Sequence, residues 1–381
     1  MSTRTAPKIE SIAPLAILRT GCVTSAGLNA PSTFAALRAR LNNFTETTVL
    51  DSHGEPLIAA CIETLAAGGG GATAQRGSLA WQADLLELAM DDCLRTITRL
   101  PPAKDIPLLL CVSEVTRPGR PPGLDEQLLP AIEKRQHCRF APSSQVYAYG
   151  QAGIGMALAD AFKLLDKHPL ILLAGVDSLA HFDTLQGLHA RGRVLDTDNA
   201  NGVIPGEAAC CLLLGRAQDA SAYPPLLTNR LAAPAFASRA AQSPATADTL
   251  FCMAASIQRE PPGADALDRA NSLTRAITEV LAPSKRDPLQ VALRVCSQIG
   301  TDQRAREMAV ASARASVSAT PLWCLADSLG ETGAAAGPLA LAWAYAAMHK
   351  GYAPGPSALS LLASDEGEHC AVLLGFGRYQ A

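Results

Sequence analysis

The sequence predicts an α/β protein, and three observations lead to that prediction. Short apolar runs alternate with longer segments whose apolar residues recur at helical spacing, which is typical of βαβ units. Pro and Gly residues stand between these segments and end them. The chain has 381 residues, of which 48% are hydrophobic and 18% are charged, so it can bury a large core. This length suggests two or three domains, or one large duplicated fold.

The apolar pattern places the elements in order along the chain. In the first half, short apolar runs bounded by turn residues predict strands at 17–23, 107–112, 170–174 and 208–214. Helical spacing in the same half predicts helices at 31–39, 77–97, 124–134 and 151–166. In the second half, the same criteria predict strands at 289–296, 357–363 and 371–375. The helices expected there are 264–281, 303–315 and 332–349. The boundary between the halves is placed near 218–223, which gives domains 8–219 and 220–381.

Two segments have the composition of loops, and two others resemble each other. Residues 66–72 read AAGGGGA, and residues 232–263 are rich in Ala, Ser and Pro, with a short apolar patch at 250–253. The run GQAGIGMALADA beginning at Gly150 is similar to GAAAGPLALAWA beginning at Gly333. Each is a small-residue turn that leads into an Ala/Leu-rich helix. Together with the two α/β halves, this weak repeat indicates an old duplication.

Charge and hydropathy argue against several classes of function. The net charge is −3, so no basic field is available to hold a nucleic-acid backbone. No apolar run reaches the ~18 residues of a membrane span, and the first residues lack the pattern of a secretion signal. The glycine run lacks the Gly-Lys-Ser/Thr of a phosphate loop. We expect a cytoplasmic protein without a cofactor that binds neither nucleic acid nor membrane.

The eleven cysteines are expected to be reduced and mostly buried. Their number is odd, their spacing is scattered, and no CxxC pair is present, so neither a zinc site nor a disulfide framework is expected. Several lie in apolar runs, where Cys behaves as a small hydrophobic residue. Cys138 follows Arg135 and His137, and cationic neighbours lower a thiol pKa, so a reactive Cys138 is a less favoured alternative.

Four segments in order resemble the β-ketoacyl synthases of the thiolase-like superfamily. They are LAILRTGCVTSAG at 15–27, the block at 170–215 that runs from LILLAGVD to PGEAACCLLLG, SLGETGAAAG at 328–337, and SLLASDEGEHCAVLLGFG at 360–377. The resemblance spans nearly the whole chain, and the order and spacing of its motifs are more specific than any one of them. It implies two βαβαβαββ halves in five layers (αβαβα), with two mixed sheets around buried helices, and an obligate two-fold dimer.

The resemblance also implies a catalytic set, and the matching positions lack it. Condensing enzymes place a thiolate at a helix N-terminus, where the helix dipole lowers the pKa of the thiol. That position falls on Gly150, with Gln151 as the neighbouring choice, and no cysteine lies within ten residues. The first family His falls on Gln298 or Ile299, and the lysine falls on Ala326.

The second family His falls on the Gly-Glu pair that ends at Glu331. The thiol, both imidazoles and the lysine are therefore missing together, which predicts a protein without the ketosynthase reaction and without catalytic residues. Glu331 could act as a general base, but an acidic residue beside a helix N-terminus is the simpler interpretation.

Three other polar groups have simple structural interpretations. His181 and His189 flank Asp183, but a spacing of eight residues does not place two ligands on one helix turn, so surface histidines are favoured over a metal or base pair. Asp196 lies in a loop that departs from the EF-hand pattern and is expected to accept loop hydrogen bonds. The acidic turn at 365–368 is expected to be a solvated hairpin.

These observations leave several functions open. The favoured one is a non-catalytic homodimeric adaptor or chaperone, because degenerate ketosynthase-like proteins of this type resemble those associated with type VI secretion effectors and spike proteins. Its candidate contact or lid region is 232–263. The alternative is a non-nucleophilic partner subunit, like a chain-length factor, or an acyl-binding or acyl-transferring protein that acts with an acyl carrier protein. In such subunits Gln often replaces the cysteine, which draws attention to Gln151. A third interpretation is a hydrolase that uses Glu331 and a water.

Overall fold

Two groups of five strands follow one another along the chain of this computed structural model, which describes residues 14–63, 74–95, 97, 100–223, 248–261, 263–282, 290–297 and 301–377. The first group is β1 (Leu15–Thr24), β4 (Leu108–Cys111), β5 (Gln145–Tyr147), β6 (Leu170–Ser178) and β7 (Glu207–Arg216). The second is β8 (Thr249–Arg259), β9 (Leu293–Cys296), β10 (Leu322–Cys324), β11 (Ser357–Ala363) and β12 (Glu368–Gly377). A separate hairpin pairs β2 (Thr45–Leu50) with β3 (Pro56–Ala59).

The two groups share one topology. The first is ordered β1-β7-β6-β4-β5, and the second is ordered β8-β12-β11-β9-β10. In both groups the first two pairings are antiparallel and the last two are parallel. Strands related by chain order thus occupy equivalent places, which supports the duplication indicated by the weak sequence repeat. The boundary of the two domains near 218–223 stays a prediction.

The two expected sheets are joined into one ten-stranded sheet. Leu15, Ala16 and Ile17 of β1 pair with Cys252, Phe251 and Leu250 of β8. The patch at 250–253, expected within a loop, therefore belongs to an interior strand, and the loop prediction was wrong for that part. The whole of β8, Thr249–Arg259, falls in that expected loop, and its small residues Ala254, Ala255 and Ser256 gave the segment a loop-like composition although they pack between layers, where little space is available. Residues 66–72 and 232–247 lie outside the described residues.

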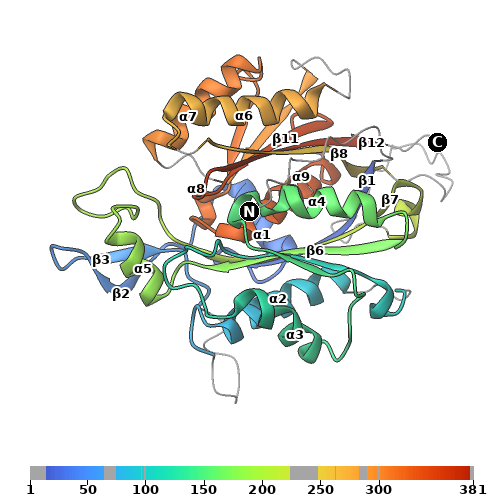
Figure 1. The fold of residues 1–381 in the computed structure, drawn as a ribbon, viewed down its shortest axis with the longest axis horizontal. Coiled ribbons are helices and arrows are strands. Elements are labelled where there is room, and N and C mark those ends of the chain that lie inside the picture. The colour runs from blue at the N-terminus through green and yellow to red at the C-terminus, as the bar shows by residue number, and fades with distance from the viewer. Residues whose placement is uncertain are drawn as a thin grey trace, which may run out of the picture.

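Helices complete the five layers (Figure 1). α2 (Leu79–Leu94) and α3 (Leu124–Arg135) cover the outer face of the first strand group, and α6 (Ala266–Leu281) and α7 (Asp302–Arg314) cover that of the second. Between the two groups lie α4 (Gly153–Leu164) and α9 (Ala336–His349), which contact strands of both. Shorter helices connect these layers: α1 (Ala30–Ala39), α5 (Phe182–His189) and α8 (Ala326–Leu329). The architecture is the predicted αβαβα arrangement.

Of the two middle helices, α9 is apolar on every side, whereas α4 has a polar face with Asp160 and Lys163. Every residue of α9 from Ala336 to Met348 is buried. α4 and α9 approach closely because Gly337 packs directly on Ile154. Short 3₁₀ turns precede both helices, η3 (Gly150–Ala152) before α4 and η6 (Gly333–Ala335) before α9. The turns η2 (Ala103–Asp105) and η4 (Ala217–Ala222) do not bear on the site.

The structure places the cysteines mostly in the interior of the protein. All eleven cysteines are free thiols, and all except Cys138 are buried. Burial, with a smaller contribution from Glu133, raises the pKa of Cys138, so the suggestion of an activated thiol was wrong. Among the described helices, none is long and apolar enough to cross a membrane.

Candidate active-site region

Two equivalent glycines begin the turns before the buried helices. Gly150 starts η3 with φ +53°, and Gly333 starts η6 with φ +50°. A left-handed backbone conformation is unfavourable for residues with a Cβ and natural for glycine. The two turns contact each other between the strand groups. The sequence repeat that begins at these two glycines therefore corresponds to one structural feature that occurs twice: a glycine with positive φ that begins a 3₁₀ turn before a helix.

A carboxylate occupies the space beside each of these glycines. A Cβ added at Gly150 would overlap the carboxylate of Glu114, and a Cβ added at Gly333 would overlap that of Asp177. Glu114 and Asp177 are both buried. The position predicted for the nucleophile therefore has no room for a side chain while Glu114 keeps this conformation.

Arg117 joins the two carboxylates. Its Nη2 lies 2.5 Å from Glu114 Oε2, and its Nη1 lies 3.4 Å from Asp177 Oδ2. Burial opposes the charge of Arg117, but the surrounding carboxylates outweigh it and raise the pKa of Arg117. Burial also raises the pKa of Asp177, although Arg117 and the backbone N–H of Ala334 favour its ionised form. The centre of the region is thus a buried, ion-paired triad.

A second chain of hydrogen bonds links the two halves beside the triad. Gln151 donates from Nε2 to Glu331 Oε1 at 2.5 Å, and Ser297 donates to the side-chain oxygen of Gln151. The backbone N–H of Gly333 donates to the same Glu331 oxygen at 3.0 Å. Gln151 and Glu331 are both buried. The amide of Gln151 is therefore held in place from both sides.

Glu331 has the structural role expected for it, and its role as a general base stays a prediction. It accepts the N–H of Gly333 at the start of η6, as an acidic residue near a helix N-terminus should. Burial, assisted by the charge of Asp365, raises its pKa to about 7. Its Oε2 has no hydrogen-bond partner among the described residues. The carboxyl group of Glu331 can therefore gain or lose a proton near neutral pH, but it is enclosed by protein.

The turn between β11 and β12 closes the region and is not simply solvated. Ser364 accepts the N–H of Ala152 at 2.9 Å and donates to the carbonyl of Tyr149, so the turn is fastened to η3. Asp365 lies 2.8 Å from Arg193 and 3.7 Å from Arg304, and these arginines outweigh the desolvation of its carboxylate and hold its pKa below its usual range. The prediction of a hairpin was right, and that of a merely solvated turn was wrong.

The remaining predicted positions lie nearby or outside the described residues. Ala326 begins α8, and its backbone N–H donates to Ser297 O at 3.0 Å. Gln298 and Ile299 lie outside the described residues. The structure thus brings Gly150, Gln151 and Glu331 together, with Ala326 one hydrogen bond beyond Ser297. Their assignment to lost catalytic residues stays a prediction.

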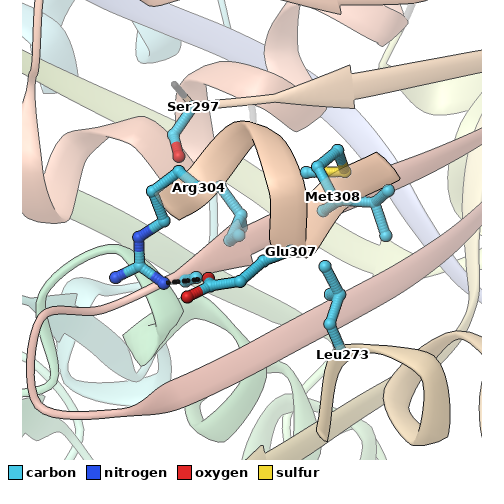
Figure 2. Close-up of a pocket in the computed structure, with 8 residues that line it drawn as sticks. Leu273, Ser297, Arg304, Glu307 and Met308 are labelled. Carbon is cyan, nitrogen blue, oxygen red and sulfur yellow. Dashed lines mark hydrogen bonds and ion pairs between the residues drawn. The ribbon is translucent and has the colours of Figure 1, made fainter. Parts of the chain in front are cut away.

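A small cavity adjoins Ser297 (Figure 2). Its volume is about 10 Å³, which leaves room for about one water. Arg304 and Glu307 lie on its wall, with Arg304 Nη1 3.0 Å from Glu307 Oε2. Leu273 and Met308 supply its apolar side. This cavity is too small for an acyl chain.

Buried thiols lie close to α4 but do not replace the missing nucleophile. Cys111 and Cys370 border Gly153 and Gly155 of this helix. Burial raises the pKa of Cys370 to about 12 and also raises that of Cys111. Neither thiol is ionised near neutral pH, and the thiolate is the reactive form.

The histidines suggested as a pair do not form one site. His181 Nε2 lies 2.7 Å from Thr184 Oγ1, and burial lowers the pKa of His181. His189 instead lies 3.1 Å from Asp196 Oδ2. Asp196 also accepts the N–H groups of Asp198 and Asn199, so its predicted loop role is confirmed.

One three-residue cluster outside this region has ligand atoms close enough for a metal ion. It comprises Glu260, Glu307 and His369, whose ligand atoms all lie within 4.8 Å of one another. Arg269 lies 3.6 Å from Glu260 and 4.0 Å from Glu307, so cations of the protein already offset these carboxylates. The cluster is a structural ion-pair network.

Sequence reasoning missed the groups that fill the site. Glu114 and Arg117 follow β4, and Asp177 lies near the end of β6, which runs parallel to β4. The carboxyl ends of neighbouring parallel strands meet at one edge, where α/β proteins place functional groups. Charged residues directly after two predicted strands were therefore the available signal. Ser297 and Ser364 carried no comparable signal.

Comparison with solved structures identifies the fold. The chain aligns with the ishigamide ketosynthase/chain length factor at a TM-score of 0.67, with 15% identity, over 95% of this chain and 99% of that chain. It aligns with AntDE:AntF, a type II PKS acyl-carrier protein in complex with its ketosynthase bound to the hexaketide, at a TM-score of 0.71, with 13% identity, over 96% and 99% of the two chains. A β-ketoacyl synthase from Burkholderia phymatum STM815 gives 0.67 and 16%, over 97% and 100%.

The fold is therefore the thiolase-like fold of the ketosynthases. No protein-family model and no curated protein matches the chain. At these identities the likeness concerns the fold alone, and function has to be argued from the site.

Proposed function

We propose that this chain is a non-nucleophilic ketosynthase-fold subunit, similar in role to a chain-length factor. It pairs with a second ketosynthase-fold chain that supplies the thiol, and the pair acts on acyl groups carried by an acyl carrier protein. Two of the similar structures carry the names of a ketosynthase/chain length factor and of a ketosynthase in complex with an acyl-carrier protein. Those names support this class of partner.

The observation that carries the proposal is the carboxylate of Glu114 in the space beside Gly150. A condensing reaction needs a thiolate at this helix N-terminus, stabilised by the helix dipole and N–H groups. A buried carboxylate in that space would repel a thiolate and a developing oxyanion alike. The local chemistry therefore opposes formation of an acyl thioester on this chain.

The second supporting observation is how firmly the site is closed. Gln151 is hydrogen-bonded by Ser297 and Glu331, and Arg117 is held between two carboxylates. Before a substrate could enter, these hydrogen bonds and ion pairs would have to be broken, which would leave buried polar and charged groups without their partners. A hydrolase that uses Glu331 would also need water to reach an enclosed carboxyl group. Closure therefore favours a supporting subunit over either reaction.

Exposed apolar side chains beyond the carboxyl ends of three strands offer a place for the second chain. β5 is the last strand of the sheet and is parallel to β4, as is β6. Just beyond the carboxyl ends of these three strands lie Val115, Tyr149 and Phe182, with exposed fractions of 65%, 37% and 56%. Large exposed apolar side chains that follow the carboxyl ends of neighbouring strands are candidates for an interface.

The adaptor hypothesis is weaker on present observations. The similar structures named above are ketosynthases and a chain length factor, and none carries a secretion-related name. A role as a homodimeric adaptor for type VI effectors or spike proteins stays a prediction. Recovery of such an effector or spike protein is one possible result of the partner experiment described below.

The first experiment asks whether the chain carries acyl groups. The purified full-length chain is incubated with an acyl-loaded carrier protein, and its intact mass is measured. We expect no added acyl mass on the wild-type chain or on Gly150→Cys, because Glu114 remains beside the introduced thiol. An acyl adduct on the wild-type chain would contradict the proposal.

The second experiment identifies the partner. The tagged full-length chain is purified from its native cell, and bound proteins are identified by mass spectrometry. We expect a cysteine-containing ketosynthase, lost in Val115→Arg and Phe182→Arg but retained in Leu41→Arg, whose residue is 60% exposed elsewhere on the surface. Recovery of a secretion effector or spike protein instead would support the adaptor hypothesis and reject the partner-subunit proposal.

A further inference from the structure

A second cavity lies away from the region described above. It has a volume of about 180 Å³ and is bordered by β1, α1, α2 and α9. For comparison, an engineered cavity of about 150 Å³ binds benzene. Tyr345 on its wall is the tenth residue of α9, about 14 Å along the helix from the end that faces Glu331. The cavity is therefore distinct from the ketosynthase-like site.

Arg19 of β1 lines this cavity without a partner. Its exposed fraction is only 5%. Nε and Nη1 are buried and have no hydrogen-bond partner, and the guanidinium group forms no ion pair with any described residue. Arginine stays protonated in proteins, and a buried unpaired charge is strongly unfavourable. A group that neutralises Arg19 is thus missing from its surroundings.

The acidic side chain that lines this cavity, Asp92, already has partners. Asp92 Oδ2 accepts the N–H groups of Cys22 at 3.3 Å and Ala30 at 2.7 Å. Asp92 Oδ1 lies 3.3 Å from Nη2 of Arg95, whose side chain is 61% exposed. The cavity wall therefore holds two guanidinium groups and one carboxylate whose oxygens are already occupied.

The other groups on the wall also suit an anion. Ala30 is the first residue of α1, and although its N–H already donates to Asp92, the N-terminus of the helix adds partial positive charge to the wall. Thr20 adds a hydroxyl group, and Tyr345 donates its own hydroxyl to Leu18 O at 3.1 Å. A planar guanidinium group matches the geometry of a carboxylate or phosphate.

We propose that this cavity binds a small molecule through a carboxylate or phosphate group held by Arg19. The anion would balance the charge of Arg19, which forms no ion pair with any described residue, and the rest of the ligand would fill the space between α1 and α9. Arg95, at the exposed side, would assist capture of the negative charge.

The test uses the full-length chain with inorganic phosphate and with acetate, each titrated at constant ionic strength. The readout is the rise of the melting temperature, because a ligand that binds only the folded state stabilises it in a saturable way. We expect saturation with at least one anion, and no saturable shift in Arg19→Met. The anion that saturates at lower concentration decides between carboxylate and phosphate chemistry. Arg306→Met, at a side chain that is 76% exposed, should behave as wild type.

Two further measurements keep the test decisive. Without added anion, Arg19→Met should melt at the same temperature as wild type or higher, because it removes an unpaired buried charge. A lower melting temperature would show that groups of the protein itself hold Arg19, and would overturn the proposal. Ala30→Leu is a second variant, which fills the same cavity without changing charge and should abolish the saturable shift. Retained binding in either variant, or no saturation in wild type, would also overturn it.

Discussion

At the residue scale, two glycines share the same local geometry. Gly150 and Gly333 both combine a positive φ with a carboxylate in the space of a Cβ. The surroundings of Gly150 leave no room for a side chain. The carboxylate of Glu114 fills that space, and Arg117 forms an ion pair with Glu114. A thiol introduced at Gly150 by a single substitution would meet both the left-handed backbone conformation and the carboxylate.

The first prediction concerns this close contact. Gly150→Ala should lower the free energy of unfolding by about 2–4 kcal/mol, because overpacking costs about 1–3 kcal/mol and the positive φ costs about 1 kcal/mol more. Urea denaturation monitored by circular dichroism measures the change. Gly192→Ala is the matched control, since Gly192 has φ +61° but nothing lies within 4 Å of an added Cβ. Equal losses in both variants would show that Glu114 gives way easily.

The second prediction concerns pH. The pKa of Glu331 is about 7 in the folded chain, and its ordinary value is 4.5. Between these values the folded chain keeps a proton on Glu331 that the unfolded chain has released, so the contribution of Glu331 to stability falls as pH rises from 4.5 to 7 and is constant above 7. The total loss is about 3 kcal/mol, because the free energy of unfolding falls by about 1.36 kcal/mol for each pH unit between the two pKa values.

Glu331→Gln isolates this contribution. The amide oxygen of the new side chain can still accept from Gln151 and Gly333, while the charge is gone. Compared with wild type, the variant should be more stable at pH 8 by up to about 3 kcal/mol and nearly equal at pH 4.5. Glu46→Gln, at an exposed position, should leave the difference unchanged. Urea midpoints at the two pH values decide, and a variant that is less stable at pH 8 would contradict the assignment.

At the element scale, the turn between β11 and β12 fastens the second half of the chain to η3. Ser364 bonds to the N–H of Ala152 and to the carbonyl of Tyr149, more than 200 residues away in sequence. These bonds satisfy backbone groups at the start of a turn that has no side-chain cap. The turn therefore positions η3 as well as closing the region.

The third prediction follows from those two bonds. Ser364→Ala should destabilise the chain by about 1–3 kcal/mol, because it leaves a buried N–H and carbonyl without partners. Ser360→Ala is the control within the preceding strand: Ser360 is fully buried, and its hydroxyl has no hydrogen-bond partner among the described residues. That change should be neutral or stabilising. Equal effects of the two substitutions in urea denaturation would show that the bonds of Ser364 contribute nothing.

Elements with a strong apolar pattern could be predicted from the sequence, and those fixed by long-range pairing could not. The strand expected at 357–363 is β11 as observed, and the helix expected at 124–134 ends one residue later. β5 and β10 were missed because three residues carry no periodicity. β8 was missed because its small residues resemble a loop in composition, and only pairing with β1 and β12 makes it a strand.

The sequence predicted where the site lies better than it predicted which side chains fill it. The sequence repeat located Gly150 and Gly333, and the resemblance located Gln151 and Glu331 beside them. Glu114 could not be placed, because its contact with Gly150 depends on how β4 and β5 lie side by side. Contacts between residues far apart in sequence arise from the packing of whole elements, which local patterns do not specify.

At the scale of the whole molecule, the two halves share one core. α9 contacts β1, β6 and β7 of the first group and β8, β9 and β11 of the second. The pairing of β1 with β8 makes the sheet continuous across the same boundary. Separating the halves would expose the apolar surface of α4 and α9 on both sides, at a cost of about 25 cal/mol for each Å². Neither half should therefore be stable without the other.

The fourth prediction is that the chain unfolds in one cooperative transition. Trp81 lies on α2 in the first half, whereas Trp323 and Trp343 lie on β10 and α9. Trp81→Phe leaves reporters only in the second half of the chain, and a Trp323→Phe/Trp343→Phe double variant leaves one only in the first. In each variant, the urea midpoint by tryptophan fluorescence should equal the midpoint by far-ultraviolet circular dichroism, because coincidence of probes is the test of two-state unfolding. A fluorescence midpoint that departs from the dichroism midpoint in either variant would show that one half melts before the other, and that the helices shared between them do not bind the duplicated fold into one unit.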